Sequence, residues 1–531
     1  MNKHNVERAS LPKILLFSLT LITTIVYIIY RLIFTIPFDL RLIDIVFGII
    51  VVVIELIEIF EFCVYFENTL IHKKSSPKTP KASEKDFPDV DVFIATFNEE
   101  SELLEKTISA CKNMKYPDAK KLHIYLCDDG NRKEIKQLAK KNKIEYITRD
   151  NNNFAKAGNY NNAIKKSGSP LIAVFDADMQ PSKNFLMKTV PFFVAEEKIG
   201  FVQTPQSFKN PDIFQARLSK HLPFEQDYFY HYIQLARNNN NSTILCGTNC
   251  VISREALKSV GGFSTATIAE DIATGMLIES KGYRAIAISD VLAYGEATNN
   301  LNNFLKQRSR WGRGCIQTAK AYEMFRLKGL SLRQKLDYFV AINYWCFGLR
   351  RMLYMILPLL FAFFGIIAIQ GDLVVFLPIF LVQFVLRRFL IDTLEGSYSS
   401  STWTKIFEII QAPFMSLVVL KEIMGFSSKK FTVTPKGKSA KKGHADAILF
   451  IVHAILIAAN ITGIVLSIQR IQNENLAVFI IPLIWMVINA IYLSVALIFD
   501  LRKNKNYANF KPNTETKYHA KSYLGIIARG K

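Results

Sequence analysis

The chain has 531 residues, half of them hydrophobic, with 66 Lys and Arg against 45 Asp and Glu, a formal net charge of +21. A chain of this length accommodates two or three domains. High apolar content with a strong excess of basic residues favours a membrane protein with a cationic cytoplasmic face over a nucleic-acid-binding protein. The seven cysteines include no CxxC pair. This spacing argues against a disulfide framework or a zinc site and fits a reducing compartment.

Residues 1–67 are predicted to form a membrane hairpin. Two apolar stretches, at about 14–34 and 43–66, are long enough to cross about 30 Å of hydrocarbon. The first has no small-residue cleavage site, so a retained helix is expected rather than a signal peptide. The second carries glutamates at positions 55, 58 and 61, at helical spacing. Because charges at that depth are costly, these side chains are expected to face other helices or a polar path, with the membrane interface as the alternative.

A basic linker at 68–86 leads into a region with a different pattern, at 87–325. Strand-like runs at 90–97, 122–129 and 171–178 are separated by helical stretches. Alternation of strands and helices predicts an α/β domain with a largely parallel sheet, which binds ligands at the carboxyl ends of its strands. Basic residues flank the preceding hairpin on one side, which predicts a cytosolic location for this domain.

Polar side chains follow each of these three strands, and acceptors at three consecutive strand ends predict one site. In the third run, LIAVFDADMQ, two carboxylates stand close enough to repel each other. A divalent cation such as Mg²⁺ or Mn²⁺ compensates such repulsion and also binds phosphates. An acidic turn after a buried strand is the alternative. The side chains in question are Thr96, Asn98, Glu99, Asp128, Asp129, Asp176 and Asp178.

The region 326–500 is predicted to contain interface helices and further membrane spans. Amphipathic segments at 330–345 and 402–426 are expected to lie in the interface. Six spans in total leave every long basic segment on the cytoplasmic side, including a loop at 427–444 and a tail at 501–531. The four spans of this region are predicted at about 352–369, 373–391, 445–468 and 476–499.

Two further blocks carry candidate chemistry. Glu270 and Asp271 stand at the start of a helical pattern, where the helix dipole alone favours carboxylates. In NNLNNFLKQRSRWGRGCIQ three arginines surround Trp311. Guanidinium groups pair with phosphate oxygens and an indole face stacks on a sugar ring, while an interfacial anchor is the alternative. The three arginines are Arg308, Arg310 and Arg313.

Taken together, these motifs resemble the processive family 2 glycosyltransferases, and within them the cellulose synthases. The shared motifs occur in the family's order, and FTVTPKG is similar to the FxVTxK gating-loop motif of cellulose synthases. The resemblance covers nearly the whole chain. It implies an α/β GT-A (Rossmann-like) domain inserted between transmembrane helices. The motifs are DDG at 128–130, AKAGNYNNA at 155–163, DAD at 176–178, VQTPQ at 202–206, CGTN at 246–249, ED at 270–271, QRSRW at 307–311 and FTVTPKG at 431–437.

The resemblance also implies roles for residues of this sequence. Asp271, beside Glu270, would be the general base that deprotonates the acceptor hydroxyl in an inverting displacement. Asp176 and Asp178 would hold Mg²⁺ or Mn²⁺ on the donor's diphosphate. The implied acceptor contacts are Gln307, Trp311, Cys246, Gly247 and Thr248. The implied nucleotide-sugar contacts are Thr96, Asn98, Glu99, Asp128, Asp129, Lys156, Asp176, Arg310, Phe431, Thr434 and Lys436, the last three in a lid.

The implied activity is polymerisation of glucose from UDP-glucose into a β-1,4 or mixed β-1,3/1,4-glucan that crosses the plasma membrane. A synthase of hyaluronan, a chitin-like or a capsular polymer from another UDP-sugar is the alternative. The implied partners are a UDP-sugar, the growing polysaccharide and the lipid bilayer. An accessory subunit or self-association is left open, and no nucleic acid is expected. Both termini and the catalytic domain are expected in the cytoplasm.

Four features depart from the relatives' patterns. Ala269 stands where many relatives have Thr, and Met179 stands where some have a metal-binding His. The helix after ED lacks the arginine usual in hyaluronan synthases, which favours glucose as the donor sugar. The stretch after the last span, about thirty residues, is too short for the PilZ domain that responds to cyclic-di-GMP in bacterial cellulose synthases.

Overall fold

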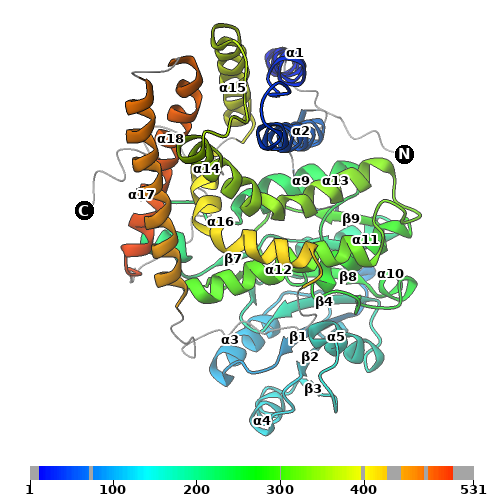
Figure 1. Ribbon diagram of the computed structural model, residues 1–531. Helices are drawn as coiled ribbons and strands as arrows, with labels where there is room; N and C mark the ends of the chain where they lie inside the picture. The colour runs from blue at the N-terminus through cyan, green and yellow to red at the C-terminus, as the bar shows by residue number, and fades with distance from the viewer. Residues whose placement is uncertain are drawn as a thin grey trace.

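The computed structural model describes residues 11–70, 76–298, 300–395, 401–426, 444–471 and 476–505, and every structural statement concerns these residues. An α/β domain lies at one end of the molecule and a set of long helices at the other (Figure 1). The predicted lid residues Phe431, Thr434 and Lys436 lie outside the described residues.

The centre of the domain is a seven-stranded sheet with the order β3-β2-β1-β4-β8-β6-β9, in which β3 (Glu145–Ile147) is an edge strand. β1 (Val90–Thr96), β2 (Leu122–Asp128) and β4 (Leu171–Asp176) begin where the sequence predicts and end one or two residues earlier. They run parallel, with Thr96 opposite Asp128 and Ala95 opposite Asp176. The carboxyl ends of these three strands therefore meet at the same edge, as the sequence predicts.

Six of the seven strands run in the same direction, as expected for a largely parallel sheet, and β8 is the exception. β8 (Cys250–Ser253) runs antiparallel to β4 and to β6 (Ile199–Gln203), while β9 (Arg284–Ala287) runs parallel to β6. Because β8 is reversed, the residues before it, from Cys246 on, lie beside the carboxyl ends of β1 and β4. A small second sheet has the order β5-β10-β7. Its strands are β5 (Gln180–Pro181), β10 (Ala293–Gly295) and β7 (Ser207–Phe208).

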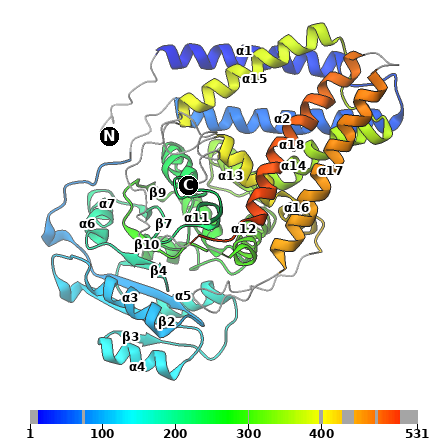
Figure 2. The same ribbon diagram turned by 90° about the vertical axis from the view of Figure 1, so that its left-hand side faces the viewer.

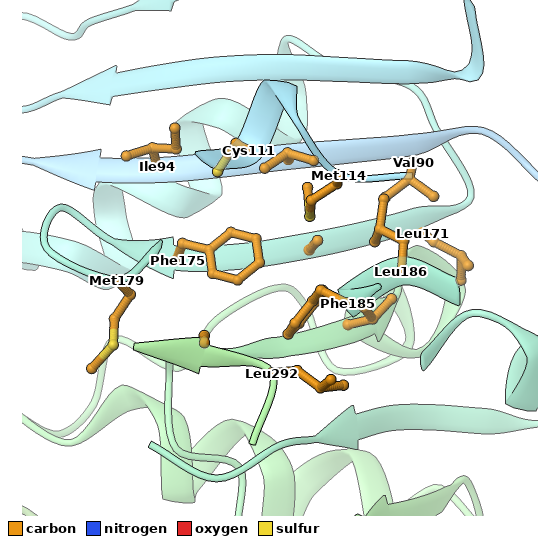
Figure 3. Packing of buried hydrophobic residues seen from close by; sticks show 14 of the residues in the cluster. Val90, Ile94, Cys111, Met114, Leu171, Phe175, Met179, Phe185, Leu186 and Leu292 are labelled. Atoms are coloured by element: carbon orange, nitrogen blue, oxygen red, sulfur yellow. The ribbon is translucent and has the colours of Figure 1, made fainter. Parts of the chain in front are cut away.

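Helices cover both faces of the central sheet, so its strands are apolar on both sides, as expected for strands buried on both faces. Alternate residues of β1 enter different cores. Ile94 packs in the cluster that contains Leu104 of α3 (Ser101–Lys112), while Phe93 packs in the cluster that contains Tyr160 of α5 (Ala155–Lys165). Figure 3 shows the first cluster, with Phe175 of β4 beside Ile94 and Phe185. Three further helices flank the sheet: α4 (Lys133–Asn142), which precedes β3 in the chain, α10 (Arg254–Ser259) and α11 (Glu270–Ser280).

Five helical stretches among the described residues are long and apolar enough to cross a membrane, at 11–34, 332–364, 373–391, 445–471 and 479–501. The helix predicted as the second span carries four acidic residues up to position 61 and is not one of the five. The six-span arrangement therefore remains a prediction. The long helices of these regions, including the one predicted as the second span, are α1 (Leu11–Phe34), α2 (Leu42–Leu70), α14 (Phe347–Phe364), α15 (Leu373–Glu395), α17 (Ala445–Ile471) and α18 (Leu476–Leu501).

The glutamates of α2 face neighbouring helices, which confirms one of the two arrangements expected from their spacing. Glu55 forms an ion pair with Arg31 of α1 at 2.8 Å and accepts a hydrogen bond from Tyr27 at 3.1 Å. Glu61 forms an ion pair with Arg350 of α14 at 2.7 Å. Pairing of this kind reduces the cost of placing a charge among apolar helices.

Three helices connect the domain to the long helices: α12 (Leu301–Ala321), α13 (Leu332–Asn343) and α16 (Ser401–Ile423). Figure 1 shows α16 between α12 and α14, and Figure 2 shows α1 and α2 running alongside each other at the opposite end of the molecule from α4. Arg313 of α12 pairs with Glu422 of α16 at 3.0 Å, and Arg351 of α14 pairs with Glu408 at 2.6 Å. α16 is therefore tied to both parts of the molecule.

Candidate active site

Asp128, at the end of β2, is fully buried and its carboxylate is surrounded by donors. The backbone N–H groups of Gly130 and Arg132 donate to it at 3.0 and 2.8 Å, the Tyr146 hydroxyl donates at 2.9 Å, and the Arg132 guanidinium donates at 3.1 Å. Gly130 is required here because a Cβ atom would lie 2.4 Å from the Phe97 carbonyl oxygen. These contacts fix the DDG turn.

Arg132 also joins this turn to the end of β1. Its guanidinium donates to the Thr96 hydroxyl at 2.7 Å and to the Glu99 carbonyl at 2.6 Å, and the Thr96 hydroxyl donates to the Glu99 carboxylate at 2.7 Å. An open cleft of about 670 Å³ lies over this network, a volume typical of small-molecule sites. Of the predicted donor residues, Asn98, Glu99 and Asp129 line this cleft, and Thr96 and Asp128 lie in the network below it. The cleft is lined by Phe97, Asn98, Glu99, Glu100, Ser101, Asp129, Gly130, Arg132, Glu134 and Asn152.

Three polar residues of this side were not singled out from the sequence: Arg132, Tyr146 and Arg149. Arg149 forms two hydrogen bonds with the Asp129 carboxylate, at 2.5 and 2.8 Å. A signal existed for Arg132, because an arginine four residues after Asp128 can fold back onto that carboxylate across a tight turn. Arg149 and Tyr146 come from a separate strand and loop, and no sequence spacing points to them.

Lys156, in the first turn of α5, connects the two halves of the site. Its ammonium group donates to the Asp176 carboxylate at 2.6 Å and to the Gly247 carbonyl at 2.7 Å. Burial alone would lower the pKa of Lys156, but the carboxylates of Asp176, Glu270 and Asp271 outweigh it and raise the pKa. Lys156 therefore stays a cation at the centre of the acidic residues.

Asp176 and Asp178 supply hard oxygen ligands of the kind that Mg²⁺ and Mn²⁺ prefer. Asp176 is partly exposed, whereas Asp178 is buried. Within the described ranges no group of three or more His, Cys, Asp or Glu side chains is placed to hold a metal ion. A cation held by these two carboxylates would therefore take its remaining ligands from outside the pair, such as water or a bound phosphate group.

Met179, directly after the DAD motif, is a core residue. It is buried in the cluster of Figure 3, and its sulfur accepts a hydrogen bond from the Asn249 side-chain amide at 3.5 Å. A Cβ atom on Gly295 would lie 2.6 Å from the same sulfur. Met179 therefore fills a core position and packs closely against β10.

Glu270 and Asp271 are the first two residues of α11, and Gly247 packs against Asp271. Gly247 has a positive φ of 69°, and a Cβ atom there would lie 3.0 Å from the Asp271 carboxylate. The Ile272 N–H donates to Asp271 at 2.8 Å. In the part of the chain that the structure describes, neither carboxylate has a cationic partner within ion-pair distance.

The protonation of this pair follows from its surroundings. Burial raises the pKa of both carboxyl groups, and the charge of Asp271 raises the pKa of Glu270 further. The cations Lys156 and Arg310 oppose this effect without cancelling it. A carboxylate with a raised pKa is a better proton acceptor than a free aspartate.

Helix α12, which contains the QRSRW motif, closely contacts the residue before the ED pair. A Cβ atom on Gly314 would lie 2.3 Å from the Cβ of Ala269. A small residue before the ED pair therefore suits the close approach of α12. Trp311, one turn earlier, meets Trp345 edge to face at 6.5 Å between ring centroids.

The three arginines around Trp311 have different surroundings. Arg308 is buried, pairs with Glu225 at 2.5 Å and lies over the Trp311 ring at 4.3 Å. Arg313 pairs with Glu422 on α16 at 3.0 Å. Only Arg310 acts on the Glu270 and Asp271 carboxyl groups through its charge. Arg308 and Arg313 therefore hold Trp311 and α16, while the charge of Arg310 acts on the carboxyl pair.

The CGTN loop is held by a residue whose role the sequence left unassigned, Gln203 of the VQTPQ motif. Its side chain accepts from the Cys246 N–H at 2.8 Å and donates to the Thr248 carbonyl at 2.9 Å. Thr248 is itself buried and accepts from the Asp176 N–H at 2.9 Å. The loop thus ties the predicted acceptor residues to the predicted metal ligand. Gln307 lies beside Arg308, whose guanidinium donates to it at 3.3 Å.

Two protein families match parts of this chain. The family "Glycosyl transferase family 2" matches residues 91–261, and the family "Cellulose synthase" matches residues 258–499. The resemblance to these two families is confirmed. The α/β domain is a GT-A domain, and the helices before and after it make the chain a membrane protein.

Individual relatives are similar over most of this chain. A cellulose synthase catalytic subunit [UDP-forming] of Pseudomonas fluorescens (strain SBW25) is 30% identical over 487 residues, which cover 91% of this chain and 66% of the relative. Putative cellulose synthase 2 of Komagataeibacter xylinus is 30% identical over 508 residues, covering 93% of this chain and 33% of the relative. The chain thus spans about two thirds of the first relative and one third of the second. A solved structure, mannosyltransferase PcManGT from Pyrobaculum calidifontis in complex with GDP-Man and Mn2+, aligns with 17% identity and a TM-score of 0.47, covering 71% of this chain and 99% of that one.

Proposed function

We propose that this chain is a membrane-embedded, processive, inverting β-glycosyltransferase that polymerises glucose from UDP-glucose into a β-1,4 or mixed β-1,3/1,4-glucan and translocates it across the plasma membrane. One observation carries the proposal. Lys156 bridges Asp176 and the Gly247 carbonyl, and Gly247 packs against Asp271. The end of the donor cleft that suits a diphosphate therefore lies next to the residue that suits a general base.

The donor would lie with its nucleoside in the cleft over the Thr96, Glu99 and Arg132 network, and with its diphosphate toward Asp176. A divalent cation bound by Asp176 and Asp178 would neutralise charge on the leaving diphosphate. Lys156 and Arg310 add positive charge on the same side. Preorganised cations of this kind stabilise the leaving group as its negative charge develops.

Asp271 would accept the proton of the acceptor hydroxyl. As that proton moves to the carboxylate, the hydroxyl oxygen forms a bond to the anomeric carbon and the bond from this carbon to UDP breaks. Attack opposite the leaving group inverts the configuration, so an α-linked donor gives a β-linked product. Burial supports this role because it raises the pKa of Asp271.

The position of Trp311 supports processive synthesis. Its ring meets that of Trp345 edge to face, and Trp345 lies two residues before the start of α14. Ion pairs of α16 with α12 and with α14 connect the same helices. An acceptor sugar held against Trp311 would therefore have its far end directed toward the helices that suit a membrane. Such an arrangement disfavours release of the polymer into solvent after each addition, and therefore favours repeated addition of sugars to the same polymer.

The proposal is tested with the purified full-length chain in lipid nanodiscs, supplied with UDP-glucose and Mg²⁺ or Mn²⁺. We expect release of UDP and formation of a polymer that β-glucanases degrade. A β-1,4-specific and a mixed-linkage-specific glucanase then distinguish the two linkage patterns. Parallel reactions with other UDP-sugars test the donor. UDP release from a different sugar alone would overturn the glucose assignment, and no release from any donor would overturn the whole proposal.

A further inference from the structure

An apolar groove lies where α2 meets α13, and none of the residues that line it belongs to the candidate active site. We call it the α2–α13 groove. Its volume is about 400 Å³, and the rings of Phe325 and Phe60 each lie within 6 Å of Phe339, at 5.7 and 5.9 Å between centroids. No polar side chain lines it. Its lining residues include Val53, Leu56, Phe60, Phe325, Leu336 and Phe339.

The groove continues a stripe of exposed apolar side chains on α2. The spacing of these residues alternates between four and three, so they share one face of the helix. All of them are at least 36% exposed although they are large and apolar. Such a face on a long helix of a membrane protein suits contact with lipid chains. The stripe consists of Leu42, Val46, Ile49, Val53, Leu56 and Phe60, and its last three members line the groove.

Basic side chains stand at the other end of the groove. Arg326 directly follows the groove residue Phe325, and Arg333 lies one turn before Leu336 on the same face of α13. Both side chains are exposed, as is Lys328 between them. Lys335 donates to the Phe325 carbonyl at 2.8 Å, which holds this segment against α13. Glu323, paired with Arg326 at 3.3 Å, is the single acidic side chain in the described segment 323–336.

We propose that the α2–α13 groove binds an anionic glycerophospholipid, with an acyl chain against the aromatic residues and its phosphate headgroup against the basic rim. The apolar stripe leads from lipid-facing surface into the groove, and the rim supplies charge of the sign opposite to an anionic headgroup. Basic residues next to apolar surface are typical of helices that lie in the membrane interface. This inference does not depend on the proposed glycosyltransferase activity, because its readout is lipid binding.

Binding can be measured by native mass spectrometry of the purified full-length chain, delipidated and then titrated with phosphatidylglycerol or with phosphatidylcholine of the same acyl chains. We expect a tightly bound phosphatidylglycerol and weaker binding of phosphatidylcholine. Equal binding of both lipids would overturn the role of the rim. Displacement of phosphatidylglycerol by inorganic phosphate or by soluble glycerophosphoglycerol would show that an acyl chain is not needed, and would overturn the groove as a lipid site.

Two variants separate the rim from the groove. The triple variant Arg326→Gln, Lys328→Gln, Arg333→Gln should weaken phosphatidylglycerol binding roughly tenfold or more, since each basic residue near an anionic surface strengthens binding by roughly fivefold. It should leave phosphatidylcholine binding nearly unchanged. Lys133→Gln, Lys136→Gln, Lys140→Gln, on exposed positions of α4 at the far end of the molecule, is the matched control.

Leu56→Trp should obstruct the groove and weaken binding of both lipids. Its control is Ile49→Trp, which places the same ring on the same exposed stripe outside the groove. Both positions are exposed, so neither substitution disturbs a buried core. Unchanged lipid binding in Leu56→Trp, or an equal loss in Ile49→Trp, would overturn the proposal.

Discussion

Two pairs of adjacent acidic residues in the candidate site have opposite surroundings. Asp128 and Asp129 are buried, and each is paired with an arginine, Arg132 at 3.1 Å and Arg149 at 2.5 Å. Glu270 and Asp271 are also deeply placed, yet have no ion pair among the described side chains, and burial raises the pKa of both.

The difference lies in the partners of the carboxylates. The guanidinium and N–H groups around the first pair hold its carboxylates in fixed positions. A buried carboxylate without such a partner keeps a high affinity for a proton. The first pair therefore shapes the donor cleft, while the second is suited to take a proton from a substrate.

Asp271→Asn tests this contrast most strongly. The amide keeps the shape of the side chain but cannot accept a proton, so turnover should fall about 10³-fold, within the range usual for loss of a general base. UDP affinity should change less than about threefold, because the donor network is separate. UDP release and calorimetric UDP binding measure the two effects. Glu255→Gln, on the exposed side of α10, is the control. Turnover within tenfold of the unchanged chain would contradict the base assignment.

The pH dependence of turnover gives a second test of the same pair. Asp271 must be ionised to act as a base, and its pKa is raised by burial, so kcat at saturating donor should fall tenfold per pH unit below a pKa higher than the ordinary aspartate value of about 3.9. Burial and the charge of Asp271 raise the pKa of Glu270 to about 7, so Glu270 is still protonated and neutral while Asp271 ionises at lower pH. Glu270→Gln keeps this neutral state and should leave the acidic limb in place. A limb that moves to lower pH would show that Glu270 is already ionised when Asp271 loses its proton.

Much of this arrangement could be predicted from sequence because it depends on short-range patterns. The apolar runs before Thr96, Asp128 and Asp176 fix three parallel strands, and parallel strands bring their ends together whatever follows. That the ED pair at a helix start and the QRSRW motif belong to one site was inferred from the family resemblance alone. No periodic pattern links Asp271 with Gly247.

What could not be predicted depends on contacts between distant segments. Arg149 reaches Asp129 from a loop twenty residues away, and Gln203 holds Cys246 across forty-three residues. A polar side chain with one partner leaves no periodic signal. The reversed direction of β8 was also missed, because an apolar strand reads the same in a parallel and an antiparallel sheet.

Arg132→Lys tests the donor side. Lysine keeps the positive charge but loses the planar fork that contacts Thr96, Glu99 and Asp128 together. We expect roughly tenfold weaker binding of UDP-glucose, equivalent to losing one charge-assisted hydrogen bond, with kcat within about threefold. The neighbouring exposed Lys133→Gln is the control. A fall in kcat with unchanged donor affinity would place Arg132 with the catalytic pair instead of the donor cleft.

Cys246→Ser should have the smallest effect, and it sharpens what the acceptor side requires. Burial raises the pKa of the Cys246 thiol, so the group is a neutral thiol at physiological pH and a weak nucleophile. The thiol accepts a hydrogen bond from the Gln234 amide at 3.6 Å and donates one to the Ile244 carbonyl at 3.5 Å. A serine hydroxyl can make both contacts in place of the thiol. We therefore expect kcat and the KM for UDP-glucose to change less than about threefold. If turnover were lost while UDP binding persisted, the thiol itself would take part in the reaction. Asp271 alone would then not explain how the acceptor hydroxyl is activated.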